Sequence, residues 1–113
     1  MSVDFIKYGN RKIKVVHGHL DDCYGLFDPN LHTLYIDKRQ SGMRLFNTLM
    51  HELFHIIIFY AGINVNERGE EPIATAVGNG YEKVFKQNPK LWGQLTRLLY
   101  GSRIWYRKSN IFW

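Results

Sequence analysis

The segment His51-Glu52-Leu53-Phe54-His55 carries the residue types best suited to chemistry in this chain. Residues four apart on a helix differ by about 40° of rotation and about 6 Å of rise, so both imidazoles can reach one metal ion. Glu52, beside the first histidine, is then placed to take a proton from a metal-bound water. The spacing therefore predicts a metal site with His51 and His55 as ligands and Glu52 as a base.

The surroundings of this motif are strongly apolar. Apart from the two histidines and the glutamate of the motif, every residue from Leu49 to Tyr60 is large and hydrophobic. Two imidazoles and a carboxylate buried there are costly unless each finds a partner, and one metal ion would satisfy all three. The alternative is that both histidines are ordinary core or surface residues, that the glutamate faces water, and that the chain binds no metal.

A catalytic zinc site needs three protein ligands and a water, so a third ligand must come from elsewhere in the chain. No histidine follows the motif. The earlier histidines lie in a part expected to form strands and are interpreted as surface or strand residues. They are His17, His19 and His32. The acidic residues after the motif are Glu67, Glu70, Glu71 and Glu82. We therefore expect a carboxylate as the third ligand.

Glu71 has the best spacing among these acids, and Glu70 is the alternative. If a helix begins here, Glu71, Ala74 and Gly78 fall on one face. The small side chains of Ala74 and Gly78 would let this face approach the motif helix closely, as a glutamate-to-zinc bond of about 2.0 Å requires. Glu70 is only one position away, and both carboxylates would also complement the dipole of a helix that starts near them.

The elements that must position these residues change in type near residue 40. Two short runs of alternating apolar residues flank Gly9-Asn10, and residues 25–37 form a second such pair around Asp28-Pro29-Asn30. Both central segments consist of turn-forming residues. We therefore expect residues 1–40 to form a small antiparallel sheet.

The apolar residues follow a helical period from Ser41 onwards. Ser41 is a suitable N-cap, and Gly62 is a natural C-terminal stop. The apolar positions between them are too dense for a helix with one buried face. We expect this helix, which carries the motif, to be central and buried.

Two further helices are expected after a loop. Pro72 is placed in the first turn of a helix that runs to about Gln87, and Pro89 opens another. Residues 41–100 would then form about three helices, followed by a basic, aromatic tail at 101–113. Strands first and helices afterwards indicate an α+β fold.

The composition fits one small domain. A chain of 113 residues with 45% apolar and 22% charged residues is enough for a single core. The longest strongly apolar stretch, Leu53 to Ala61, has about half the length needed to cross a bilayer. No basic region followed by an apolar run is found near residue 1, and a single cysteine, Cys23, excludes an internal disulfide. We expect a cytoplasmic protein without membrane contact.

A family resemblance rests on the motif and on the segment that follows it. His51-Glu-Leu-Phe-His55, followed by Glu71-Pro-Ile-Ala74, resembles the small zinc-dependent metallopeptidases of the ImmA/IrrE type. That family pairs an HExxH helix with a Glu-x-x-Ala helix. The resemblance covers residues 24–85 approximately.

This resemblance implies a minimal zincin-like domain that hydrolyses a bond in a peptide or protein substrate. It implies that His51, His55 and Glu71 bind one Zn²⁺ ion and that Glu52 is the catalytic base. It also implies that the strand Leu31 to Asp37 is an edge strand that lines the cleft, and it suggests a bacterial or phage regulatory setting.

Peptide hydrolysis also needs a hydrogen-bond donor for the oxyanion that forms at the attacked carbonyl. His32, Tyr60 and Tyr81 are candidates for this role or for substrate contact. Each has packing as its alternative role, and residue type alone does not rank them.

The C-terminal part of the chain supports a second hypothesis. The formal net charge is +5, and no acidic residue follows Glu82. Cations beside flat rings are typical of surfaces that bind single-stranded nucleic acid, although the same rings can pack on a core. The alternative is thus a catalytically degenerate zinc-binding module whose basic, aromatic C-terminus binds nucleic acid or a protein partner. Its candidate contacts are Arg97, Arg103, Arg107 and Lys108.

Overall fold

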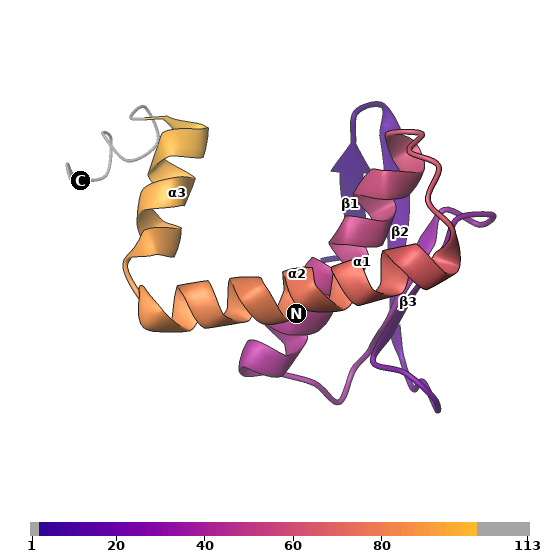
Figure 1. Ribbon diagram of the computed structural model, residues 1–113, viewed down its shortest axis with the longest axis horizontal. Helices are drawn as coiled ribbons and strands as arrows, with labels where there is room; N and C mark the ends of the chain where they lie inside the picture. The colour runs from indigo at the N-terminus through magenta and orange to yellow at the C-terminus, as the bar shows by residue number, and fades with distance from the viewer. Residues whose placement is uncertain (1–2, 102–113) are drawn as a thin grey trace. The chain divides into compact units, whose positions relative to one another are not determined.

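The computed structural model describes residues 3–101, and within them a four-stranded sheet is followed by three helices (Figure 1). The strands are β1 (Phe5–Tyr8), β2 (Arg11–Gly18), β3 (Gly25–Asp28) and β4 (Thr33–Asp37). The helices are α1 (Gly42–Tyr60), α2 (Glu67–Gln87) and α3 (Leu91–Tyr100). The predicted α+β class is confirmed.

The sheet is mixed, with the strand order β1-β2-β4-β3. The pairs β1·β2 and β3·β4 are antiparallel hairpins, as expected, and Gly9 adopts the positive φ of 60° that the first turn requires. The central pair β2·β4 is parallel, so the prediction of a purely antiparallel sheet is wrong. The reason is that β3 takes the outer position and β4 returns between β2 and β3, an order that alternation within each strand does not encode.

The connection from β2 to β3 crosses the end of β4 and is fixed there by Asp37. The Asp37 carboxylate, 2% exposed, accepts hydrogen bonds from the amides of Leu20 (3.3 Å) and Arg39 (2.9 Å) and from the Arg39 guanidinium. The Asp37 amide donates to the carbonyl of Tyr24 (2.9 Å). The hydrogen bonds from Arg39 hold the pKa of Asp37 well below its usual range. This cluster holds the connection, and with it β3, at the edge of the sheet.

Helix α1 packs on one face of the sheet, and Ile56 joins Ile13, Val15, Leu34 and Ile36 in the buried core. The helix is buried along one line rather than on all sides, because its fully buried residues, Thr48, Glu52 and Ile56, are four residues apart. Ile57 and Phe59 are each 46% exposed. The helix is therefore buried along this line, and the expectation that it is buried on all sides is wrong.

Helix α1 has the predicted ends. Ser41 is its N-cap residue, although its side chain makes no capping hydrogen bond, and the chain leaves the helix through Ala61. Gly62 follows with a φ of 72°, and its amide donates to the carbonyl of Phe59 (3.2 Å). The glycine stop is therefore a left-handed residue just after the helix.

Helix α2 begins at Glu67, five residues earlier than predicted, so Pro72 lies inside the helix rather than in its first turn. Asn66 provides the start: its side-chain oxygen accepts from the amide of Gly69 (2.8 Å) and its carbonyl accepts from that of Glu70 (3.0 Å). An asparagine cap stabilises a helix start, while an internal proline removes only one hydrogen bond and adds local strain. Glu70 and Glu71 consequently lie within the helix.

The chain divides into two compact parts, Met1–Glu82 and Lys83–Trp113, which are described separately. In the second part α3 begins at Leu91, two residues after the Pro89 that is expected to open it, and ends at Tyr100 as expected. The rings of Phe85 and Trp92 meet edge to face with centroids 5.4 Å apart. No helix within residues 3–101 is both long and apolar enough to cross a membrane.

Candidate metal centre

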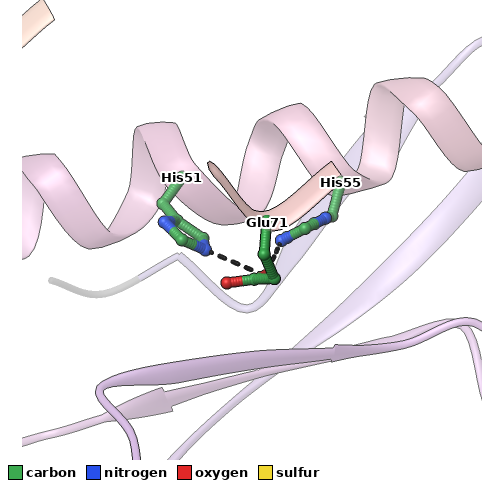
Figure 2. A group of neighbouring side chains, drawn as sticks. All are labelled: His51, His55 and Glu71. Carbon is green, nitrogen blue, oxygen red and sulfur yellow. Dashed lines mark hydrogen bonds and ion pairs between the residues drawn. The ribbon is translucent and has the colours of Figure 1, made fainter. Parts of the chain in front are cut away.

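Side chains from α1 and α2 converge at one point. The Nε2 atoms of His51 and His55 lie 3.3 Å and 2.5 Å from the same carboxylate oxygen, Oε1 of Glu71 (Figure 2). One ligand atom from each of the three residues lies within 4.8 Å of the other two. The structure thus brings together the two histidines of the motif and the acid that the spacing favoured.

The close approach of α2 to α1 depends on small residues. Ala74 is fully buried, and Gly78 is buried directly against Asn47 of α1. A Cβ atom at residue 78 would lie 2.9 Å from the Asn47 carbonyl oxygen. The side-chain amide of Asn47 donates to Glu82 (2.7 Å), so this further candidate acid is engaged beside α1 and away from the histidines. The predicted face of Glu71, Ala74 and Gly78 is the one in contact.

Glu70 contacts His55 on the side of the ring opposite to Glu71. Its carboxylate is hydrogen bonded to Nδ1 of His55, while Nε2 of that ring faces Glu71. The side chains of Glu70 and His55 are only 18% and 15% exposed. A carboxylate on Nδ1 fixes the ring orientation and keeps the Nε2 lone pair available for a metal. The spacing makes Glu70 an alternative metal ligand. In the structure it instead occupies the position of a residue that orients the ligand His55.

Glu52 lies beneath this group and is 6% exposed. It faces β3, where a Cβ atom at Gly25 would lie 3.1 Å from its Cγ. Its carboxylate is 3.9 Å from Nε2 of His51. Burial raises the pKa of Glu52 above its ordinary value, and Glu71 adds to this rise, whereas the two nearby histidines oppose it. A carboxylate with a raised pKa is suited to accept and return protons near neutrality.

Residues of each helix shift the pKa of a group on the other helix. Burial acts to lower the pKa of His55, but its hydrogen bond to the Glu70 carboxylate, the charge of Glu52 and the contacts of Glu71 together raise it. Burial acts to raise the pKa of Glu71, but its contacts with His51 and His55 lower it. Without a metal, the group therefore favours a charged His55 imidazole beside a charged Glu71 carboxylate.

The donor set suits zinc. Two imidazole nitrogens and one carboxylate oxygen are common ligands of a catalytic zinc ion, which keeps its fourth position for water. Zinc bonds of about 2.0–2.1 Å separate tetrahedral donors by roughly 3.3 Å. The His51–Glu71 donor separation is 3.3 Å, the His55–Glu71 separation is shorter at 2.5 Å, and all three donors lie within 4.8 Å of one another. Neutral histidines and the anionic Glu71 would replace the present ion pairs with bonds to the metal.

A cavity of about 940 Å³ opens onto the group. Its wall includes the catalytic candidate Glu52, both histidines and both acids of α2. Strand β3 and residues 20–24 form the facing wall. The edge strand at the cleft is therefore β3, not the strand Leu31 to Asp37 of the resemblance, because β4 lies between β2 and β3. The glycine at position 25 is the sequence signal that marks where α1 and this strand meet.

The remaining candidates lie elsewhere. Nδ1 of His32 is 2.5 Å from the hydroxyl of Tyr60, and their rings stack with centroids 5.7 Å apart. Neither residue is among the described residues that line the cavity, and the same is true of Tyr81, which is 49% exposed on α2. Arg97 lies in the last turn of α3. Arg103, Arg107 and Lys108 lie outside the described residues.

Comparisons with protein families, with characterised proteins and with solved structures find no match for this chain. The resemblance to ImmA/IrrE-type peptidases therefore stays a prediction that rests on the motif. Function has to be argued from the site itself.

Proposed function

We propose that this chain is a zinc-dependent metallopeptidase that hydrolyses a peptide bond with Glu52 as its base. The observation that carries the proposal is the convergence of His51, His55 and Glu71 in one cavity, with the buried Glu52 adjacent. An ordinary pair of core histidines would not account for two carboxylates from a second helix gathered around one ring. The site holds one ion per chain in this proposal.

His51, His55 and Glu71 would hold the zinc ion, and Glu70 would keep the His55 ring in place. Bound zinc supplies a water of lowered pKa and polarises the carbonyl that is attacked. Glu52 would accept a proton from the attacking water as the oxygen of that water bonds to the carbonyl carbon. The same carboxyl group then donates this proton to the amide nitrogen as the carbon–nitrogen bond breaks, so the base is regenerated.

The outer edge of β3 supports a peptide as substrate. The carbonyl of Tyr24 faces β4, where it accepts from Asp37, and backbone groups alternate in direction along an antiparallel strand. Gly25 and Phe27 therefore direct their backbone groups toward the outer edge. There the Phe27 amide contacts the Glu52 carboxylate and the Gly25 amide contacts the Cys23 thiol, while both carbonyls point outward. No strand described in residues 3–101 pairs with that edge. An extended peptide can add there as a further strand, beside Glu52.

A reducing compartment fits this proposal, since the one cysteine, Cys23, is exposed and free. We therefore place the peptidase in the cytoplasm.

Metal content is the first test. Protein purified without added metal, or loaded with zinc and then desalted, is expected to contain about one zinc per chain by elemental analysis. His55→Ala should lose it, and His19→Ala is the matched control, because His19 pairs with Asp21 and is not among the cavity-lining residues or the metal-ligating group. Absence of zinc from the loaded wild type would refute the proposal.

Catalysis is tested separately with Glu52→Gln. This variant should keep the zinc and lose peptide hydrolysis by a factor of at least about 100, since it removes the proton acceptor. Hydrolysis that survives in Glu52→Gln would show that another group or a contaminating peptidase is responsible.

A further inference from the structure

The cavity has two chemically different ends. Gly25 of β3 packs on Thr48 and Glu52 in the first half of α1, whereas the Phe27 ring meets Phe59 near the end of α1 with centroids 5.9 Å apart. β3 and α1 thus run in the same direction along the cavity. The end near Gly25 is polar, and its lining includes Asp22, Asn47 and Thr48.

The end near Phe27 is apolar. Phe59 lies there beside Phe27, and the cavity lining also includes the apolar residues Ile63 and Val65, which follow α1 in the chain. Phe59 is 46% exposed and Ile63 is 52% exposed, and both line the cavity. The amide of Ile63 donates to the carbonyl of Ile58 (3.2 Å), which anchors this wall to the end of α1.

The direction of β3 fixes which side of the cleaved bond meets each end. An extended chain pairs slightly more favourably with a strand when it runs antiparallel to it. A peptide that runs antiparallel to β3 places residues before the cleaved bond beside Phe27 and residues after it beside Gly25. Its earlier side chains then meet the apolar wall.

From this arrangement we infer that the preferred substrate is an extended peptide, antiparallel to β3, with a large apolar side chain on the amino-terminal side of the cleaved bond. The inference rests on the proposed peptidase function and specifies its substrate class. Phe59, Ile63 and Val65 form the subsite that selects this side chain. Burial against such a wall typically changes the specificity ratio by about tenfold or more.

The test uses the zinc-loaded full chain and a mixture of unrelated synthetic peptides, with cleavage positions read by mass spectrometry. Leucine, phenylalanine and similar residues should be enriched directly before the cut, or one or two positions earlier. Ile63→Asn should lower cleavage of these peptides about tenfold, and Ile63→Glu should shift the preference toward lysine and arginine at the same position.

Ile73 provides the matched control. It is 49% exposed on α2, close to the exposure of Ile63, and it is not among the cavity-lining residues. Ile73→Asn and Ile73→Glu should leave the cleavage pattern as in the wild type. An equal change in both pairs of variants would show a general effect on folding and would overturn the assignment of Ile63.

Binding of the same mixture to the Glu52→Gln chain separates this inference from the proposed hydrolysis. Retention of apolar peptides that depends on Ile63, without cleavage by the wild type, would support the subsite and refute hydrolysis. Cleavage without apolar enrichment before the cut, or with enrichment after it, would refute the subsite and leave the peptidase intact. Neither binding nor cleavage would refute both.

Discussion

His55 and Glu70 are hydrogen bonded through Nδ1, the ring nitrogen that faces away from Glu71. The two adjacent acids of α2 therefore contact opposite sides of one imidazole. This relationship separates two roles that spacing along the chain left open, a ligand and a residue that orients a ligand.

Replacement of these acids should distinguish the two roles. Glu71→Ala is expected to abolish stoichiometric zinc binding, whereas Glu70→Ala should weaken the affinity by about 10- to 100-fold and keep one ion per chain. Glu70→Gln should fall between wild type and Glu70→Ala, because the amide can still accept from Nδ1. Competition with a zinc-binding dye measures all three affinities, and loss of stoichiometric zinc from Glu70→Ala with retention in Glu71→Ala would exchange the roles.

The contact between α1 and α2 can be tested with two glycines of one helix. Gly78→Ala places a Cβ atom 2.9 Å from the Asn47 carbonyl, so α2 must shift away from the histidines. We expect a loss of about 1–3 kcal/mol in unfolding free energy together with weaker zinc binding. Gly80→Ala meets nothing within 4 Å and should instead stabilise the protein by up to about 1 kcal/mol.

Urea unfolding and zinc titration should be run on both glycine variants. Equal behaviour of Gly78→Ala and Gly80→Ala would contradict the proposed dependence of the site on close helix packing.

The buried base should destabilise the metal-free protein. Because the folded state raises the pKa of Glu52, ionisation of this group disfavours folding above its unfolded pKa of about 4.3. Glu52→Gln should therefore stabilise the metal-free chain by about 1–3 kcal/mol at pH 7, and the difference should shrink as the pH falls toward 4. A variant that is less stable than the wild type at pH 7 would contradict the assigned cost of burying this charge.

Asp37 should show the opposite pH dependence. Its pKa is lowered in the folded protein, so its contribution to stability is complete above the unfolded pKa of about 3.9 and declines as the pH falls below it. Asp37→Asn should be clearly less stable than the wild type at pH 7, with a gap that narrows below pH 4. Asp21→Asn is the control, since the Asp21 side chain is 86% exposed.

Thermal unfolding at a series of pH values measures these gaps. A gap for Asp37→Asn that stays constant down to strongly acidic pH would show that packing, rather than the ionised carboxylate, carries the effect.

Local chemistry could be predicted from the sequence, and strand order could not. The HExxH spacing places His51 and His55 on one helix face, and the small residues Ala74 and Gly78 indicate which face of α2 approaches. Both depend only on helical periodicity. The parallel pairing of β2 with β4 depends on contacts between residues far apart in the chain, and no periodic pattern records it.

The start of α2 was misplaced because two local signals compete. Proline favours the first turn of a helix, which made Pro72 the expected start. Asn66 caps the helix upstream with a side-chain hydrogen bond to Gly69, and the helix continues through Pro72. Because α2 already begins at Glu67, Glu70 and Glu71 both project from a formed helix and contact different ring nitrogens of His55.

Strand β3 has only four residues and begins with a glycine. A free strand edge is a liability, because it can template pairing between copies of a chain, and short edge strands limit that hazard. In the proposed function, the same shortness would restrict main-chain recognition of a guest segment to Gly25 and Phe27, whose amides also contact Cys23 and Glu52. If the proposed function holds, most of the discrimination between peptides would come from their side chains, and the protein would cleave a narrow set of sequences.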